Sequence, residues 1–401
     1  MQSRAPFVFI IITVALDAMG IGLILPVMPD LIRDLDAGSV SEAAFWGGLL
    51  SFTYAAMQFT CGPLLGNLSD RYGRRPVLIL SLTFMGLDYL LMAIAPTLWL
   101  LFVARFVSGI TGATHSTASA YLADISEKGK RAANFGLVGA AFGVGFILGP
   151  AIGGLLGELG PRAPFIAAGI LALANAAFGY FALPETLPVE KRRAFEWRRA
   201  NPFRALMRLR RLPMVGGLML VFFLYSVANY VYPAVWSYFT IERFGWSVGT
   251  VGLSLAAFGI SSAFVQGWLI RKQIGWMGEH RTAVFGLVMT IVAMVILAVI
   301  TEGIWVFVFM PITAMGVVVG AAVQGMMADR IPDDAQGELQ GVLSSVSAVS
   351  VIISPVMMTG VFRYFTREET PVYLPGAPFL LAAGLAGASL AILWARRAHT
   401  E

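Results

Sequence analysis

The chain has 401 residues, of which 58% are hydrophobic and 13% are charged. A soluble domain carries roughly 25% charged residues, so this composition excludes a soluble globular domain and indicates a polytopic membrane protein. The net charge of +5 does not indicate nucleic-acid binding, because the basic residues lie in short stretches between apolar runs.

The chain contains one cysteine, Cys61, and three widely spaced histidines, His115, His280 and His399. One cysteine cannot form an intrachain disulfide, and scattered histidines do not form a metal-binding motif. Since no nucleophile–base pair or aspartate-rich metal motif is visible either, we expect no metal, no cofactor and no enzymatic activity.

The first apolar run, residues 7–28, carries a single charge, Asp17, near its centre. At ~1.5 Å rise per residue such a helix crosses a hydrocarbon core of ~30 Å. Asp17 then lies close to the midplane, where a carboxylate costs at least ~2.5–3.5 kcal/mol. The sequence therefore predicts a proton site or a substrate contact at Asp17, with an ion pair that only joins two helices as the alternative.

Twelve apolar runs are long enough to cross a membrane. They cover residues 7–28, 43–65, 76–95, 98–121, 133–157, 164–183, 214–239, 248–270, 282–300, 304–327, 338–362 and 376–395. Most Lys and Arg residues fall in alternate connections, which the positive-inside rule places in the cytoplasm. On the other side lie only Arg33, Arg162, Arg243, Arg363 and Arg367. The sequence therefore predicts a multi-pass protein with both termini in the cytoplasm.

A basic stretch, residues 191–211, divides the runs six and six. We expect an N-terminal bundle over residues 1–187, a cytoplasmic linker over 188–212 and a C-terminal bundle over 213–401. The linker is partly amphipathic, so it either lies along the anionic inner leaflet or acts only as a basic loop that sets the topology.

The two halves match each other at an offset of 205 residues. The matches are Gly47 with Gly252, Phe59 with Phe264, Gly62 with Gly267, Gly73 with Gly278, Ala123 and Asp124 with Ala328 and Asp329, Gly136 with Gly341, and Pro150 with Pro355. Parallel repeats of six spans are one plan of secondary transporters, with the substrate site near the midplane between the repeats. The predicted fold class is therefore an all-α integral membrane protein with twelve transmembrane helices in two six-helix pseudo-repeats.

Charges inside the predicted spans are few, and nearly all of them lie in the first half. Asp88 in the third span and Arg105 in the fourth lie within about 6 Å of Asp17 in depth, by the helical rise. Two carboxylates and one guanidinium cannot all pair one to one, so one acid is expected to be free for reversible protonation. In the alternative, Arg105 satisfies one acid while water in a cavity satisfies the other.

The second half supplies neutral polar and aromatic side chains in place of charges. The candidate substrate contacts in this half are Asn229, Tyr232, Trp236, Gln266 and Gln324, and Gln58 of the second span is a further candidate in the first half. A pocket of aromatic rings and a few amides suits an amphiphilic organic compound better than a sugar or an inorganic ion. For each aromatic residue taken alone, packing in the core or against lipid is the alternative.

A short connection after the second span reads GNLSDRYGRRPVL. Gly66 and Gly73 are predicted to allow close backbone approach and a sharp turn. Asp70 is predicted to face a helix N-terminus, where negative charge is favoured. Asp124 is predicted to pair with Arg74, and the cluster is interpreted as an inner latch that opens when the two halves rock.

The fifth span, residues 139–157, contains seven glycines and one proline. Small residues four positions apart let helix backbones approach closely, and a proline adds a bend. The span is therefore interpreted as a hinge or sealing helix, and the gating candidates within it are Gly149, Pro150, Gly153 and Gly154.

These motifs resemble the major facilitator superfamily, and within it the tetracycline-type drug:proton antiporters, over essentially the full length. The segments that carry the resemblance are LDAMGIGLILPVMP (16–29), GNLSDRYGRRP (66–76), SLTFMGLDYLL (81–91), ARFVSGITGA (104–113), GPAIGG (149–154), LPETLP (183–188) and GELQG (337–341). The resemblance implies the major facilitator fold, functional aspartates at Asp17 and Asp88, and a part in proton transfer for Arg105. It also implies a bacterial inner membrane as the location.

Two departures from the family pattern concern the second half. The best-known tetracycline exporters carry a histidine in the eighth helix and an aspartate in the ninth, where this chain has Ser262 and Ile291. Gln266 of the same pattern is retained. The resemblance therefore implies proton-coupled export and leaves the exported compound open.

The sequence thus predicts a proton-coupled exporter of amphiphilic organic compounds that works by alternating access, with tetracycline-like compounds as candidate substrates. We expect a monomer whose partners are the substrate, protons and the lipid bilayer. The alternative is a proton-coupled symporter or facilitator for a metabolite or a lipid-like organic anion. An integral membrane enzyme and a non-transporting receptor fit less well, because neither requires a carboxylate at the midplane of a duplicated fold.

Overall fold

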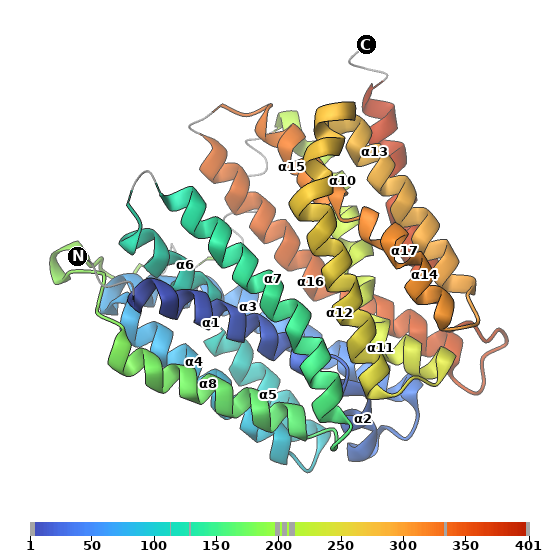
Figure 1. Cartoon of the computed structure of the whole chain (residues 1–401), viewed down its shortest axis with the longest axis horizontal. Coiled ribbons are helices and arrows are strands. Elements are labelled where there is room, and N and C mark those ends of the chain that lie inside the picture. The colour runs from blue at the N-terminus through green and yellow to red at the C-terminus, as the bar shows by residue number, and fades with distance from the viewer. Residues whose placement is uncertain are drawn as a thin grey trace. The chain divides into compact units, whose positions relative to one another are not determined.

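The computed structural model describes residues 5–112, 114–127, 130–196, 201–202, 207, 213–332 and 335–397. Across these residues the chain forms helices, turns and connecting loops, with no β-strand (Figure 1). Most of the predicted linker lies outside the described residues, so its two interpretations stay predictions.

Ten helical segments among the described residues are long and apolar enough to cross a membrane. They are Pro6–Ile24, Arg74–Ile94, Leu98–Ile125, Asn134–Gly157, Ala163–Ala182, Gly216–Phe244, Val248–Val299, Ile304–Ala328, Gln336–Thr366 and Ala377–Ala395. Val248–Val299 covers two of the predicted runs, and α3 (Val40–Tyr72) covers one more. Each of the twelve predicted runs is therefore mostly helical over its described residues.

The chain divides into two compact units. Unit 1 comprises Met1–Asp36, Thr53–Pro202 and Ser247–Ala256. Its elements are α1 (Ala5–Ile24), α2 (Met28–Ile32), most of η1 (Arg33–Ala37), the second part of α3, α4 (Arg74–Ile94), α5 (Leu98–Thr111), α6 (Thr114–Ile125), α7 (Arg131–Gly157), α8 (Ala163–Ala182), η2 (Val189–Lys191) and the first part of α12 (Val248–Phe264). Within this unit α1 packs on α6, α7 and α8, and α4 packs on α5, α6 and α8.

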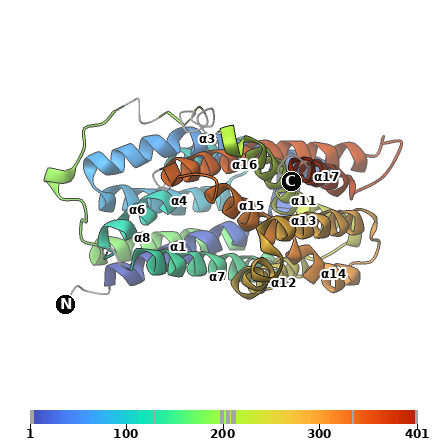
Figure 2. The same cartoon turned by 90° about the horizontal axis from the view of Figure 1, so that it is seen from above.

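Unit 2 comprises Ala37–Phe52, Phe203–Trp246 and Ala257–Glu401. Its elements are the first part of α3, η4 (Pro213–Val215), α10 (Gly216–Asn229), α11 (Val231–Phe244), the rest of α12, η5 (Val265–Leu269), α13 (Ile270–Val299), α14 (Ile304–Met315), α15 (Val318–Ala328), α16 (Gln336–Thr366) and α17 (Ala377–Arg397). Here α10 packs on α15, α16 and α17. Helix α13 packs on α14, α15 and α17 (Figure 2).

Glycines set the close packing of α7 against α1. A Cβ added at Gly145, Gly149 or Gly153 would collide with the carbonyl oxygens of Ala15, Met19 and Leu23, one turn of α1 after another. Only glycine therefore fits at these positions, and the close approach predicted for this helix is observed. Its role as a hinge stays a prediction.

The glycine pair at the 205-residue offset makes the same turn in both units. Gly73 has a φ of 110° and Gly278 a φ of 74°. These left-handed conformations cost glycine little, whereas they strain residues with a Cβ. Gly278 breaks the long helix α13 at the point where one predicted run gives way to the next. The repeat inferred from the sequence is thus reproduced at the level of backbone geometry.

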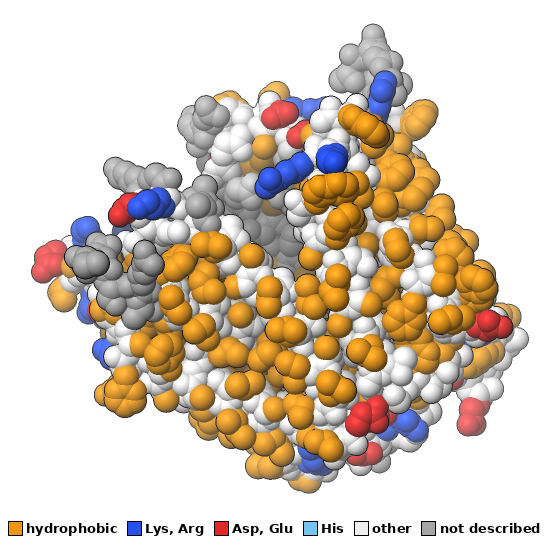
Figure 3. Space-filling view, in the orientation of Figure 1, with side chains coloured by type: hydrophobic (Ala, Val, Ile, Leu, Met, Phe, Trp, Pro, Cys, Tyr) orange, Lys and Arg blue, Asp and Glu red, His pale blue; other side chains and the backbone are white. Residues whose placement is uncertain are grey.

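The outward sides of the helices are apolar. On α7, Leu137, Val144, Leu148 and Leu155 are each about half exposed or more. On the face shown in Figure 3, apolar side chains cover the helix sides and charged side chains lie toward the helix ends. Such a surface is suited to hydrocarbon rather than to water, because soluble proteins rarely expose contiguous apolar patches of this extent.

Candidate functional site

A buried ion pair joins α4 and α5 inside unit 1. Arg105 Nη2 lies 2.6 Å from Asp88 Oδ2, and the two side chains are only 11% and 2% exposed. The pair forms because both residues lie on the buried faces of their helices, which pack on each other. Arg105 is therefore the partner of Asp88, one of the two acids that the sequence placed at similar depth.

The surroundings of this pair leave part of each group without a partner. Tyr54 of α3 places its ring 5.4 Å from the Arg105 guanidinium carbon. Arg105 Nη2 also contacts Met92 Sδ. Among the described residues, Asp88 Oδ1 and Arg105 Nε are buried without a hydrogen-bond partner. These two atoms can bind water or polar groups of a substrate.

Gln58 extends this region along α3. Its Nε2 donates to the hydroxyl of Tyr54 at 3.1 Å and to the carbonyl oxygen of Gly112 at 3.2 Å. Gly112 stands at the break between α5 and α6. Gln58, which the sequence singled out as a substrate contact, thus lies next to the ring that faces Arg105.

Asp17 differs from Asp88 in its surroundings. It is half-buried on α1, and within the described part of the chain it makes no hydrogen bond or ion pair. Tyr89, the residue after Asp88, reaches α1 one turn beyond Asp17. Its hydroxyl lies so close to Gly20 that a Cβ added there would be 2.8 Å away. A proton can therefore bind to or leave Asp17 without breaking an ion pair, whereas protonation of Asp88 would leave Arg105 unpaired.

The aromatic candidates of the second half lie together inside unit 2. Tyr232 stacks on Phe258 with ring centroids 5.6 Å apart, and both Tyr232 and Trp236 contact Phe379. Tyr232 and Trp236 are 9% and 6% exposed. The rings thus form one largely buried aromatic cluster, and their part in substrate binding stays a prediction.

The amide candidates of the second half are more accessible. Asn229 and Gln324 are half-buried, and Gln266 is exposed in the π-helical turn η5. Of the two departures from the family pattern, Ser262 is buried and its hydroxyl has no partner among the described residues. Ile291 packs against the apolar core of unit 2.

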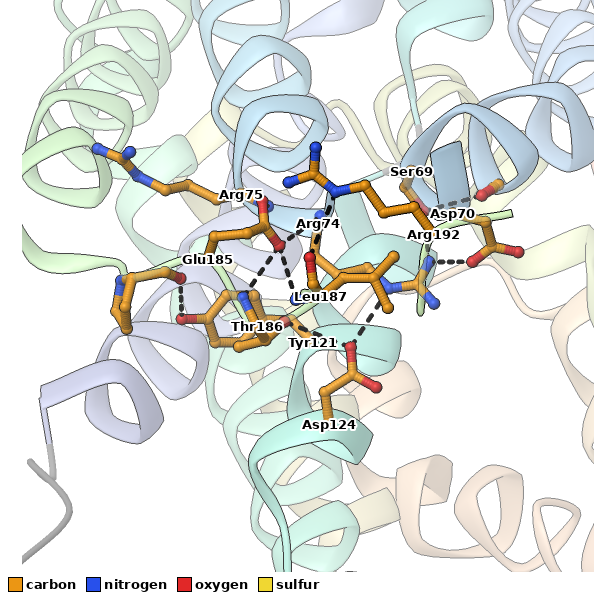
Figure 4. A network of polar contacts seen from close by, with 12 residues as sticks. Ser69, Asp70, Arg74, Arg75, Tyr121, Asp124, Glu185, Thr186, Leu187 and Arg192 are labelled. Atoms are coloured by element: carbon orange, nitrogen blue, oxygen red, sulfur yellow. Dashed lines mark hydrogen bonds and ion pairs between the residues drawn. The ribbon is translucent and has the colours of Figure 1, made fainter. Parts of the chain in front are cut away.

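A second cluster of charges lies at the end of unit 1 where α3 ends and α4 begins, which we call the Arg74 end (Figure 4). Arg74 pairs with Asp70 at 2.6 Å and with Asp124 at 3.4 Å. Thr186 Oγ1 donates to the same Asp124 carboxylate. The predicted pairing of Asp124 with Arg74 is therefore present, and all of these residues belong to unit 1. Their part in gating stays a prediction.

Glu185 is the member of this cluster that sequence reasoning missed. Its carboxylate accepts hydrogen bonds from the backbone N–H groups of Arg74 at 2.9 Å and Arg75 at 3.3 Å, and from those of Thr186 and Leu187 at 2.9 Å each. It therefore occupies the N-terminus of α4, where a negative charge is stabilised. The LPETLP segment was the available signal, because its acid stands directly after a span.

One prediction for this connection is wrong, and another stays a prediction. At the start of α4 it is Glu185 that meets the helix N-terminus, while Asp70 pairs with Arg74. The contact predicted between Asp70 and a helix N-terminus is therefore not made at α4 and stays a prediction for other helices. Gly66 does not serve a close approach, since a Cβ added there meets nothing within 4 Å in the described part of the chain. At Gly73 the prediction holds, because a Cβ there would collide with the Glu185 carboxylate.

The described residues hold no group of three or more His, Cys, Asp or Glu side chains that could bind a metal ion. Unit 1 holds a buried ion pair and, within a membrane-length helix, a carboxylate that has no ion-pair partner among the described residues. Unit 2 separately holds a cluster of aromatic rings and several amide side chains. These are the features of a transport protein that moves a solute across a bilayer.

Comparison with known proteins identifies the family. Residues 10–355 match the family model of the Major Facilitator Superfamily. The class C tetracycline resistance protein of Escherichia coli is 42% identical, over 90% of this chain and 91% of the relative. The class G protein of Vibrio anguillarum is 40% identical over the same shares. The chain therefore belongs to the Major Facilitator Superfamily, in the branch that contains the tetracycline resistance proteins.

Solved structures support the same fold. The crystal structure of a nucleoside transporter matches with a TM-score of 0.79 at 13% identity, over 97% of this chain and 99% of that chain. At this identity the likeness concerns the fold alone. Together with the family model and the relatives, the fold shows that the chain is a multi-pass membrane transporter of small organic solutes and protons, and not an enzyme.

Proposed function

We propose that this chain is a proton-coupled exporter of amphiphilic organic compounds, with tetracyclines as the first compounds to test. The names of its relatives, at about two-fifths identity over nine-tenths of the chain, support a tetracycline-like substrate. The exposed or half-buried amides Asn229, Gln266 and Gln324 and the aromatic pair Tyr232 and Trp236 are the substrate contacts we propose in the second half, with Gln58 in the first.

We propose Asp17 as the proton carrier and the Asp88–Arg105 pair as its fixed electrostatic partner. The observation that carries this proposal is the difference between the two acids: Asp88 has a cationic partner at 2.6 Å, and Asp17 has none in the described part of the chain. Protonation of Asp17 changes the charge inside the bundle without the large cost of leaving a buried ion unpaired. Only the unpaired acid can therefore change between its protonated and ionised states at a low cost in free energy.

In the proposed cycle a proton from outside neutralises the acid, the drug leaves outward, and the proton leaves to the cytoplasm. We place the Arg74 end in the cytoplasm, together with both termini, in the inner membrane of a bacterium. We also propose bundles over 1–187 and 213–401, joined by the linker over 188–212, that act as the two moving halves of a monomer. Asp70, Arg74 and Asp124 would then form the inner latch, and the glycines and proline of α7 would act in gating.

The test is proton release from the detergent-solubilised protein when tetracycline or a small panel of amphiphiles is added. Wild type is compared with Asp17→Asn and with Glu302→Gln, which removes an exposed acid at the turn before α14. We expect ligand-driven release from wild type and from Glu302→Gln, and none from Asp17→Asn. Tetracycline export in cells should be lost in the same variant while its amount in the membrane is unchanged.

The possible outcomes separate the alternatives. Binding without proton release from wild type would favour a facilitator, and uptake driven by an imposed proton gradient would favour a symporter. Normal release from Asp17→Asn would overturn the role of this acid.

A further inference from the structure

Four buried polar side chains lie at one level of unit 1, and the mechanism above uses none of them. They are Thr13 of α1, Ser81 of α4, Thr117 of α6 and Asn175 of α8, and none is more than 4% exposed. We call them the polar layer. Each lies seven or eight residues from the helix terminus at the Arg74 end, which corresponds to a depth of ~10–12 Å.

Packing places the polar layer around one region of the core. The residue that follows each member in sequence belongs to a single apolar cluster, through Val14, Leu82, Ala118 and Ala176. In addition, α1 and α4 each pack on both α6 and α8. The four polar side chains therefore border the same interior, and they interrupt an otherwise apolar core.

Two atoms of the layer have unused hydrogen-bonding capacity. Asn175 Nδ2 donates to Thr13 Oγ1 at 3.0 Å. Asn175 Oδ1 and Thr117 Oγ1 are buried without a hydrogen-bond partner among the described residues. An unsatisfied buried polar atom costs ~1–3 kcal/mol, and proteins commonly satisfy such atoms with internal water. The layer thus has the acceptors and donors that an internal water requires.

The layer also lies between Asp17 and the Arg74 end. Thr13 precedes Asp17 by four residues, on the same face of α1 and ~6 Å away along its axis. On α6, Tyr121 follows Thr117 by four residues, and its hydroxyl donates to the carbonyl oxygen of Pro184 at 2.8 Å. Pro184 is adjacent to Glu185 in the charged cluster. Polar side chains of α1 and α6 thus lie at successive depths between the unpaired acid and that cluster.

We propose that the polar layer binds internal water and that this water passes the transported proton between Asp17 and the Arg74 end. The proposal rests on the proposed function. The O–H bond of the Asp17 carboxyl breaks, its proton passes to waters held by Asn175 and by Thr117, and a carboxylate remains. The proton then leaves to bulk water at the Arg74 end, and no electrons are transferred.

The apolar residues beyond the layer explain why such a path need not leak. Phe9, Leu78 and Leu122 are fully buried in the same cluster, on the side of the layer toward the Arg74 end. They prevent a continuous water chain in this conformation. Proton passage then requires a shift of the helices, which is what coupling to transport demands.

The experiment compares two transport modes in proteoliposomes, with tetracycline as the probe. Uptake driven by a pH gradient requires net proton transfer, whereas counterflow of labelled against unlabelled tetracycline at equal pH does not. The variants are Asn175→Leu and Thr117→Val, which remove the polar atoms at nearly constant volume. The matched control is Thr290→Val in unit 2, where the buried hydroxyl already bonds the carbonyl oxygen of Gly286 at 2.8 Å.

We expect gradient-driven uptake to fall about tenfold in both layer variants, equivalent to ~1.4 kcal/mol in the barrier, while counterflow stays near the wild-type rate. The control should change neither mode. Equal rates in both modes for variants and wild type would overturn the proposal. A fall in both modes together would show a structural role only and would overturn it as well.

A second measurement does not depend on the substrate. A high-resolution structure of the wild type should show water within hydrogen-bonding distance of Asn175 Oδ1 and Thr117 Oγ1, and a dry layer would overturn the proposal even if transport is coupled. If wild type transports nothing in either mode while the layer holds water, the proposed function fails and the relay fails with it. The water site alone then remains.

Discussion

The ion pair between Asp88 and Arg105 is a costly arrangement of single residues. Both side chains are almost fully buried, and burying two charges is repaid only when their geometry is good. A hydrophobic pair of similar size would commonly be neutral or stabilising at such a place. A pair kept under these conditions points to a use in transport rather than to stability.

A double-mutant cycle separates these two roles. Asp88→Asn should destabilise the protein by roughly 3–5 kcal/mol, because Arg105 is left as an uncompensated buried charge. The double variant Asp88→Asn with Arg105→Gln should recover most of this loss, since neither side chain is then charged. Gradient-driven transport should be absent from both variants. The measurements are thermal unfolding in detergent and uptake into proteoliposomes, and recovery of transport in the double variant would contradict a role for the pair in coupling.

At this scale the sequence predicted depth and one ion pair, that of Asp124 with Arg74, but left the partner of Arg105 open. The helical rise placed Asp17, Asp88 and Arg105 within one layer. Which acid pairs with Arg105 depends on how each helix is rotated about its own axis, and the position of a residue along the chain does not fix that rotation. Glu185 was missed for a related reason, since its partners, Arg74 and Arg75, lie more than one hundred residues away.

At the scale of elements, Glu185 determines how α4 begins. Its carboxylate satisfies two of the N–H groups that the first turn of a helix leaves free. Glu185→Ala should therefore cost ~1–2 kcal/mol, in the range measured for lost helix caps. Amide hydrogen exchange should become faster at residues 73–75 and 185–187 and remain unchanged in α10 and α17. An equal increase of exchange throughout the chain would contradict this local role.

Helix α7 gives a prediction with a control in the same helix. In Gly153→Ala the new Cβ would collide with the backbone of Leu23, which cannot move independently of α1. In Gly143→Ala the new Cβ meets nothing within 4 Å of described residues. Alanine also favours a helix by ~1 kcal/mol over glycine. We expect a lower melting temperature for Gly153→Ala and an equal or higher one for Gly143→Ala, and similar losses in both would contradict the packing argument.

At the scale of the whole molecule, the repeat is reproduced in backbone and altered in chemistry. Gly73 and Gly278 adopt the same left-handed conformation, and Pro150 and Pro355 each lie inside a long helix. At the same offset, however, Arg74 becomes Glu279. The glycines and prolines were readable from the sequence because they are fixed by backbone geometry. The pairing of the charged side chains could not be read in this way, because it differs between the two halves.

Two helices are divided between the units, and this bears on how the molecule moves. The first part of α3, up to Phe52, belongs to unit 2, and α12 up to Ala256 belongs to unit 1. Within unit 2, Arg363 of α16 binds Glu42 of α3 at 2.8 Å and lies over the ring of Phe45. One residue earlier on α3, Ser41 Oγ accepts a hydrogen bond from Thr366 Oγ1 at 3.0 Å.

Alternating access predicts that α3 and α16 separate at this end once in each cycle. Ser41→Cys with Thr366→Cys, in a Cys61→Ser background, places two thiols where the hydroxyls now touch. We expect a disulfide to form under oxidation and to abolish tetracycline uptake, because α3 is then tied to α16, and we expect reductant to restore it. Each single cysteine variant should keep its activity under both conditions. Full transport by the cross-linked protein would mean that this contact stays closed throughout the cycle.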